Sequence, residues 1–302
     1  MRVATDATCS QRPCGRDTKG VPRNQGSDVP YGESAPDPPR GTIRLTPYPI
    51  GAIIKACTVP GKVALTFDDG PYEHTEKVLD ILKDWKVRAT FFVSGNNLGK
   101  GMIDDPTTPW PALIRRMVGE GHQVGSHGWS HQNMDEITAD QRERQIIYNE
   151  MALRNILGLI PKYFRPPYGV CGGDCLAQLK SWGVHAINWS LDTRDIFHNT
   201  PETIQTSKDI VKDGILPIEA FDDELRVMYN RSYLVLMHDT QYQTAYTLTD
   251  FTIRHAVDQG YELVTVAECL GDTGYWYHDA RYEDGASECL FTERKLKFPG
   301  LN

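Results

Sequence analysis

Hydrophobic residues recur at two alternating spacings between Gly61 and Val266. Short apolar runs, typical of buried strands, are separated by stretches in which apolar residues recur every three or four positions, as in amphipathic helices. The expected strands are 62–67, 89–93, 122–126, 162–165, 184–190, 233–237 and 261–266. The expected helices lie near 78–85, 109–121, 139–157, 176–182, 202–211 and 247–259.

Strands that alternate with helices predict an α/β fold with a mainly parallel sheet. Seven strands in succession favour a distorted (β/α)7 barrel related to the TIM barrel, and an open doubly wound sheet is the alternative. Cys57 and Cys269 distinguish the two, because they flank the first and last strands. These strands are neighbours in a closed barrel, so a Cys57–Cys269 disulfide would join them there, whereas an open sheet holds its end strands too far apart.

The periodic region indicates one domain, over residues 57–270. Residues 1–56 are rich in Pro, Gly, Arg and Asp without a hydrophobic period, which predicts an irregular N-terminal arm. Residues 271–302 form the expected C-terminal tail. No apolar run approaches the roughly 18 residues of a membrane span, and the first residues lack the apolar segment of a signal peptide.

Charge and cysteine content narrow the class of protein further. The formal net charge of −8 provides no broad basic surface for nucleic acid, so none is expected as a partner. Seven cysteines, two of them closely spaced at Cys171 and Cys175, favour disulfides and therefore a secreted protein. Zinc binding by Cys171 and Cys175 is the alternative, but the chain has no second CxxC-like pair at zinc-finger spacing. We expect a monomer.

Polar residues of catalytic type directly follow the expected strands. Because the C-terminal ends of barrel strands build the active site, these side chains are expected to converge on one rim. The residues concerned are Asp68 and Asp69 after the first strand, His127 and His131 after the third, Arg165 after the fourth, Asp192 and Asp195 after the fifth, and His238 and Asp239 after the sixth.

The spacing of these residues indicates a metal site. His127 and His131 lie four residues apart, within reach of one ion, and one carboxylate of the Asp68–Asp69 pair would complete a three-ligand set with an open position, as in catalytic zinc sites. Each motif alone is weak, since a D-D-G-P sequence is often a solvated acidic turn. In "FRPPYG", two prolines stiffen the loop that would direct the N–H of Tyr168 toward a substrate oxygen.

The motifs "TFDDGP", "SHGWSH", "RPPYG", "LDTRD" and "LMHD" follow one another in this order. With them the chain resembles the polysaccharide deacetylase family, which carries the NodB homology domain and is carbohydrate esterase family 4. The resemblance covers roughly residues 57 to 270. Within the family, the chain is most similar to secreted fungal chitin deacetylases. It implies metal-dependent removal of N-acetyl groups from N-acetylglucosamine units of chitin or chito-oligomers.

The resemblance also implies a role for each motif residue. The cofactor would be a divalent metal, most often zinc, which cobalt can replace. Asp69, His127 and His131 would be its ligands. Asp68 would be the general base, which Arg165 orients, and His238 would be the general acid, which Asp192 holds. Leu236 would form part of the pocket for the acetyl methyl group.

Aromatic residues near the motifs are expected to bind sugar rings. The candidates for stacking on the substrate are Tyr168, Trp129, Tyr72 and Trp110, although core or rim packing fits Trp110 at least as well. Ile196 follows the second Asp of "LDTRD", where the family often has Trp, so the wall of the sugar groove differs here. Three other functions fit the same scaffold: an O-deacetylase of acetylated xylan, an inactive carbohydrate-binding protein and an amidase for small molecules.

Overall fold

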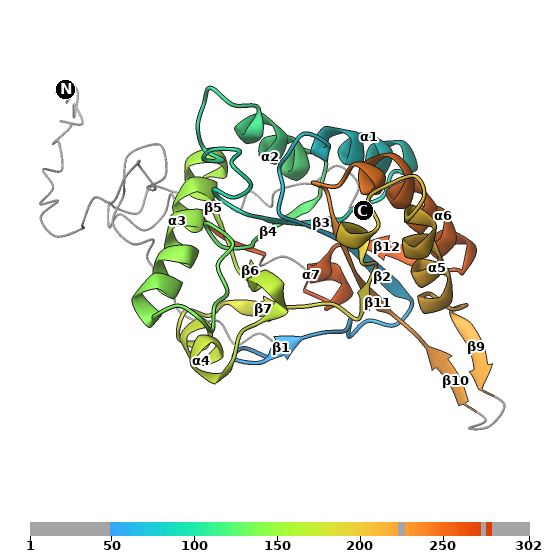
Figure 1. Cartoon of the computed structure of the whole chain (residues 1–302). Coiled ribbons are helices and arrows are strands. Elements are labelled where there is room, and N and C mark those ends of the chain that lie inside the picture. The colour runs from blue at the N-terminus through green and yellow to red at the C-terminus, as the bar shows by residue number, and fades with distance from the viewer. Residues whose placement is uncertain (1–48, 223–226, 273–275, 280–302) are drawn as a thin grey trace, which may run out of the picture.

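A curled sheet of parallel strands lies at the centre of the molecule, and helices cover its outer face (Figure 1). The computed structural model describes residues 49–222, 227–272 and 276–279. The strand order is β1-β7-β6-β4-β3-β2-β11-β8, with β12 paired to β2. Their bounds are β1 (Ile53–Ile54), β2 (Lys62–Asp68), β3 (Thr90–Val93), β4 (Gln123–Ser126), β6 (Tyr163–Phe164), β7 (His185–Ile187), β8 (Leu191–Asp192), β11 (Tyr233–His238) and β12 (Glu262–Val264).

Six longer helices match the six expected from the apolar spacing. They are α1 (Thr75–Trp85), α2 (Trp110–Gly119), α3 (Ala139–Leu157), α4 (Gly173–Ser181), α5 (Ile204–Gly214) and α6 (Thr249–Asp258). α3 has the expected limits because its ends carry strong signals: a Thr138 capping box at the start and a left-handed Gly158 after its last residue.

Two small antiparallel ladders lie outside the main sheet. β9 (Glu219–Asp222) and β10 (Val227–Asn230) form a hairpin that projects from the barrel (Figure 1). β13 (Tyr277–Asp279) comes from the expected tail and pairs with β5 (Leu159–Pro161), and β1, from the expected arm, pairs with β7. Both flanking segments therefore add short strands to the folded body, and the domain limits of 57 and 270 stay a prediction.

The sheet curls until its two edges nearly meet. β7 pairs with β1 at one edge and β8 pairs with β11 at the other, yet only three residues separate β7 from β8 in the chain. Within this short segment, Asn188 N donates to Ile54 O at 2.8 Å and Ser190 N donates to Leu234 O at 3.0 Å. The predicted distorted barrel is confirmed as a curled half-barrel. The expected fifth strand, 184–190, is shortened to β7, because residues 188–190 cross the gap between the two edges and β8 begins only at Leu191.

Alternation along β2 separates the two sides of the sheet. Its outward residues, Val63, Leu65 and Phe67, pack in the cluster beneath the helices, whereas Ala64 packs in the interior cluster with α7 (Val266–Cys269). α7 lies at the N-terminal ends of the strands. There Val266 N donates to Thr90 Oγ1 at 2.9 Å and Ala267 N donates to Gln123 Oε1 at 2.9 Å. With α7 filling this end, the C-terminal ends of the strands remain for a functional site.

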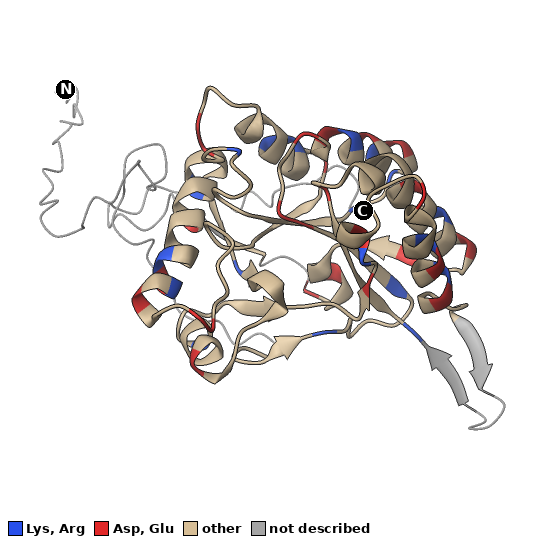
Figure 2. Cartoon of the chain, viewed as in Figure 1, with Lys and Arg blue, Asp and Glu red and all other residues tan. Residues whose placement is uncertain are grey.

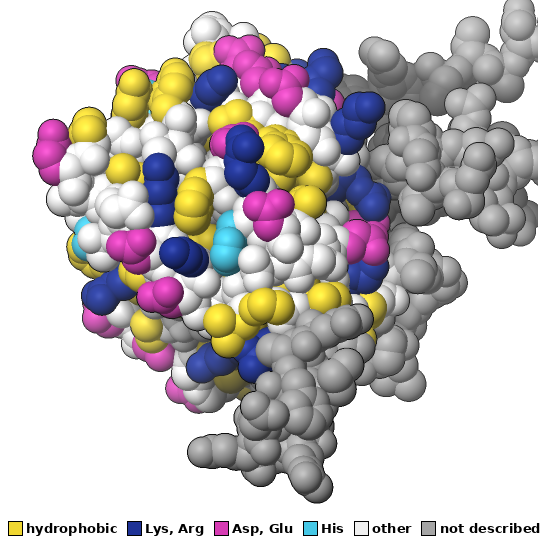
Figure 3. Space-filling model, turned by 90° about the vertical axis from the view of Figure 1, so that its right-hand side faces the viewer, with side chains coloured by type: hydrophobic (Ala, Val, Ile, Leu, Met, Phe, Trp, Pro, Cys, Tyr) yellow, Lys and Arg dark blue, Asp and Glu magenta, His cyan; other side chains and the backbone are white. Residues whose placement is uncertain are grey.

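The surface carries charges of both signs. Acidic and basic residues are interspersed along the outer helices (Figure 2). On the face of α5 and α6, hydrophobic side chains stand between charged ones (Figure 3). Across the residues that the structure describes, no helix has both the length and the apolar character needed to cross a membrane.

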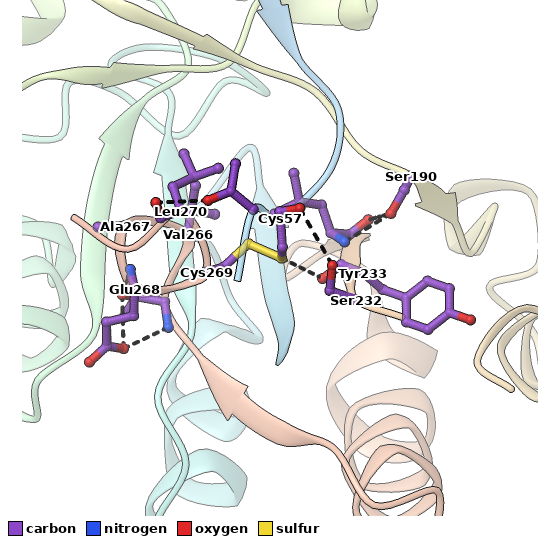
Figure 4. Close-up of a disulfide and its surroundings, with 12 residues drawn as sticks. Cys57, Ser190, Ser232, Tyr233, Val266, Ala267, Glu268, Cys269 and Leu270 are labelled. Carbon is purple, nitrogen blue, oxygen red and sulfur yellow. Dashed lines mark hydrogen bonds between the residues drawn. A yellow bond between two sulfur atoms is a disulfide. The ribbon is translucent and has the colours of Figure 1, made fainter. Parts of the chain in front are cut away.

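The disulfide predicted from the barrel topology is present. Cys57 and Cys269 are bonded with their Cα atoms 5.0 Å apart (Figure 4). The backbone N–H groups of Thr58 and Val59 both donate to Cys269 O. The bond connects the segment before β2 to α7 and so confirms that the first and last strands are neighbours. Cys171 and Cys175 form a second disulfide, so the alternative that they bind zinc is wrong.

The two disulfides are expected to contribute unequally to stability. They join residues 212 and 4 positions apart, so loss of the first releases far more chain entropy in the unfolded state. Replacing Cys57 and Cys269 with Ser should lower the free energy of unfolding by about 5 kcal/mol, against about 2 kcal/mol for Cys171 and Cys175. Urea unfolding of the two double variants measures both, and equal losses would contradict the loop-entropy explanation.

Candidate active site

The predicted catalytic side chains converge at the C-terminal ends of the parallel strands. Asp68 ends β2 and His238 ends β11, and the two are paired in register. His127 and Arg165 follow β4 and β6 directly, and Arg165 N donates to Ser126 O at 2.9 Å across these strands. The convergence on one rim that the strand pattern predicts is therefore confirmed.

Asp69, His127 and His131 form a group suited to a metal ion. Each offers one ligand atom, and these atoms all lie within 4.8 Å of one another. Nε2 of His131 and Nε2 of His127 lie 3.3 and 3.7 Å from Asp69 Oδ1. Tetrahedral zinc bonds of about 2.1 Å separate neighbouring ligand atoms by about 3.4 Å, so this donor set fits such an ion.

The environment of His127 prepares it as a ligand. Its Nδ1 lies 2.7 Å from the backbone O of Arg165, and because a carbonyl only accepts, Nδ1 carries the proton and Nε2 keeps its lone pair toward Asp69. Burial lowers the pKa of His127 to about 3, against the attraction of the Asp69 carboxylate. The imidazole is therefore neutral, as metal binding requires.

Two of the three candidate ligands lie on unusual backbone. Asp69 has φ 76° and His131 has φ 54°, both in the left-handed region that side-chain-bearing residues rarely adopt. Beside Asp69, a Cβ on Gly70 would stand 2.0 Å from Asp239 Oδ2, so only glycine fits there. Such conformations persist where surrounding contacts impose them, and they often occur at functional sites.

Arg165 orients Asp68, as the family resemblance implies. Its side chain is fully buried, and Nη1 donates to Asp68 Oδ1 at 2.8 Å and to Thr66 Oγ1 at 2.6 Å. Nη2 donates to Asn188 O at 3.0 Å, and the guanidinium lies 4.2 Å from the ring centroid of Phe92. Burial raises the pKa of Asp68, and the Arg165 charge opposes that rise. The second carboxylate oxygen of Asp68 lies 3.8 Å from Nε2 of His127, beside the candidate metal position.

The carboxylate that holds His238 is Asp195, and the predicted partner, Asp192, is wrong. His238 Nδ1 lies 2.8 Å from Asp195 Oδ1, and the backbone N–H of His238 donates to Asp195 Oδ2 at 2.7 Å. Thr244 Oγ1 also donates to Asp195 Oδ2, at 2.6 Å. Asp192 Oδ1 instead accepts from Arg194 N at 2.8 Å within the turn after β8. The turn brings the second carboxylate of "LDTRD" to the histidine.

This contact sets the charge of His238. Burial alone would lower the pKa of the imidazole, but the attraction and hydrogen bond of Asp195 outweigh it and raise the pKa to about 10. His238 is therefore protonated at neutral pH. A charged histidine on the rim can donate a proton to a leaving group.

Two of the candidate stacking residues, Trp129 and Tyr168, differ in exposure. Trp129 is only 3% exposed and packs against Gly95 and the edge of Tyr148, so its proposed stacking on sugars is wrong. Tyr168 is 64% exposed, and its ring centroid lies 4.6 Å from that of His131. Phe197, which the sequence patterns did not single out, is 65% exposed next to Ile196. Leu236 is buried in β11.

Two adjoining pockets lie beside the candidate metal ligands. Both are lined by Ser130, His131 and Tyr168, and their volumes are about 590 and 410 Å³. Asn133 lines the larger one and Asn97 the smaller, together with Asp69. Amide side chains next to an exposed ring match the mixed polar and apolar surface of a sugar.

The fold and the chemistry of its rim together define a barrel hydrolase with a candidate metal site. Comparison with known proteins identifies it further: the chain belongs to the polysaccharide deacetylase family. The model of that family, described as polysaccharide deacetylase, matches residues 55–187. This range includes the Asp68–Asp69 pair, both candidate histidine ligands and Arg165, whereas His238 and Asp195 lie beyond it.

Known relatives match a larger share of the chain than the family model does. A chitin deacetylase of Colletotrichum lindemuthianum is 43% identical over 231 residues, which are 76% of this chain and 88% of that protein. A chitin deacetylase of Pestalotiopsis sp is 39% identical over 235 residues, 78% of this chain and 72% of the relative. The solved structure of the Colletotrichum lindemuthianum enzyme aligns with a TM-score of 0.72 at 40% identity and covers 79% of this chain and 100% of its own.

Proposed function

We propose that this protein is a zinc-dependent deacetylase that removes N-acetyl groups from N-acetylglucosamine units of chitin or chito-oligomers. The observation that carries the proposal is the joint placement of a ligand set, Asp69, His127 and His131, with a buried carboxylate and a charged histidine on one rim. The names of the two fungal relatives, both chitin deacetylases, support chitin as the substrate.

The three ligands would hold zinc, which cobalt can replace. A bound divalent metal lowers the pKa of water toward roughly 7 and polarises a carbonyl oxygen, which an unreactive acetamide needs. The neutral state of His127 and the short distances between the ligand atoms support this assignment.

The acid and base divide the proton transfers. Asp68 takes the proton of the attacking water as the C–O bond forms, with Arg165 holding its other oxygen. His238 then donates its proton to the amine nitrogen as the C–N bond breaks, and Asp195 keeps the imidazole in position. The products are acetate and a free amino sugar. The backbone N–H of Tyr168 would donate to the developing oxyanion, and Leu236 would line the pocket for the acetyl methyl group.

The proposal includes the setting of the protein. Both disulfides in the described part of the chain support secretion to the cell exterior or cell wall, where disulfides persist. We propose that the enzyme acts as a monomer on the sugar polymer. An inactive carbohydrate-binding role is disfavoured because a charged acid, a carboxylate base and a complete ligand set are all present.

The proposal is tested with defined N-acetylglucosamine oligomers and acetylxylan. Mass spectrometry should show loss of acetyl groups from the oligomers with zinc or cobalt present, none with a chelator, and a rate that rises with oligomer length. His127→Ala is the matched inactive control. Acetate release from acetylxylan alone would support the O-deacetylase instead. A rate that does not depend on oligomer length would indicate a small-molecule amidase, and turnover in chelator would exclude a metal-dependent reaction.

A further inference from the structure

A buried lysine that belongs to none of the sequence motifs lies beneath the metal-ligand loop. Lys100 comes from the segment between β3 and α2 and is only 8% exposed. Its Nζ donates to Asp69 O at 2.8 Å and to Gly70 O at 3.0 Å. Lysine is rarely buried unless its charge is paired or hydrogen-bonded, so these contacts account for its position.

One of the two carbonyls that Lys100 binds belongs to Asp69, whose backbone is left-handed, and the other belongs to the next residue. Asp69 is a candidate metal ligand with φ 76°, and a non-glycine residue leaves this region readily unless contacts hold it. One donor that binds both consecutive carbonyls orients both peptide groups. Gly70 O also accepts from Ser94 N at 3.2 Å, so the turn is tied to β3 and to Lys100 together.

Asp239 packs closely against the turn at Asp69 and Gly70. Its carboxylate occupies the space where a Cβ on Gly70 would lie, and it accepts from Thr75 Oγ1 at 2.6 Å. The Lys100 ammonium attracts the carboxylates of both Asp239 and Asp69 through space. The backbone of Lys100 is also held in place, because Trp110 Nε1 donates to Lys100 O at 2.9 Å.

We propose that Lys100 is a positioning residue for the metal centre, which holds the Asp69 backbone so that its carboxylate faces His127 and His131. Lys100 touches no reacting atom, and it acts through the ligand that it orients. Groups that orient a metal ligand typically change metal affinity by about 10- to 100-fold. The inference rests on the proposed function only in assuming that the three ligands hold a metal.

The test compares Lys100→Met, which keeps the length of the side chain but loses the donor, with Lys100→Arg, which restores a donor. Lys62→Met is the matched control, because Lys62 pairs with Glu262 at the opposite end of the barrel. Zinc and cobalt affinities are measured by competition with a chelator, without substrate. The absorption spectrum of the cobalt form and the thermal unfolding of the metal-free protein are recorded alongside.

Lys100→Met is expected to weaken both metal affinities by about 10-fold or more, to alter the cobalt spectrum, and to lower kcat while KM stays unchanged. Lys100→Arg should recover most of the affinity, and Lys62→Met should bind metal like the parent protein. If Lys100→Met does not fold, Lys100→Gln, with one donor group on a shorter stem, takes its place with the same expectation.

Parent-like metal affinity in the folded Lys100 variant would overturn the proposal. An equal loss of affinity in Lys62→Met would overturn it as well, because the effect would then follow general stability. Metal binding is measured without substrate, so failure of the Lys100 proposal can be distinguished from failure of the proposed deacetylase function. A protein that binds zinc through Lys100-dependent positioning but releases no acetate from chito-oligomers would contradict only the substrate assignment.

Discussion

Asp68→Asn is expected to lower kcat on chito-oligomers by about 10³-fold while zinc stays bound. Asparagine has nearly the same shape and can still accept the hydrogen bond from Arg165, but it cannot take a proton from water. Asp68 is not in the ligand group, so the metal site should persist. Steady-state kinetics and metal analysis of the purified variant measure both effects.

Two further variants make the first result specific. His238→Ala should also keep zinc and lose activity, whereas His127→Ala should lose both because it removes a ligand. Loss of the Asp68 charge leaves the Arg165 cation buried without its counter-ion, which lowers the free energy of unfolding by several kcal/mol. Thermal unfolding must therefore confirm that the variant is folded. Near-normal turnover of folded Asp68→Asn would refute its role as base.

Asp195→Asn is expected to reduce kcat by about 10²-fold or more and to move the alkaline limb of the kcat/KM profile to lower pH. Burial lowers the pKa of His238, but Asp195, together with the smaller attractions of Asp68 and Asp69, raises it to about 10, so loss of the Asp195 carboxylate removes the largest opposing effect. Asp192→Asn is the matched control, because its carboxylate binds only the turn at Arg194. A shifted limb in Asp192→Asn and an unchanged one in Asp195→Asn would refute the Asp195 assignment.

The same pair predicts how stability depends on pH. The pKa of His238 rises from 6.5 to about 10 on folding, so the folded protein binds a proton that the unfolded chain releases in this range. This contribution is fully present below about pH 6.5 and is lost as the pH rises toward about 10. The free energy of unfolding should therefore fall more steeply between pH 7 and 10 in the parent protein than in Asp195→Asn.

Much of the architecture follows from local patterns. Strands and helices were predictable because apolar spacing reports which face of each element is buried, and α3 was bounded correctly because its capping residues act within a few positions. The convergence of Asp68, His127, Arg165 and His238 followed from one topological rule, that parallel strands end on the same side. Closure of the barrel, which makes the first and last strands neighbours, predicted the Cys57–Cys269 bond.

Tertiary contacts decided what the patterns left open. "LDTRD" offers two carboxylates three residues apart, and only the course of the turn after β8 shows that Asp195 faces His238. An aromatic ring within a catalytic motif suggests substrate binding, but Trp129 is buried because the chain at Gly95 packs against its ring. The tautomer of His127 and the position of the Lys100 ammonium depend on partners 38 and 31 residues away in the chain. Local sequence determined which residues reach the rim, whereas long-range packing determined the directions in which they point.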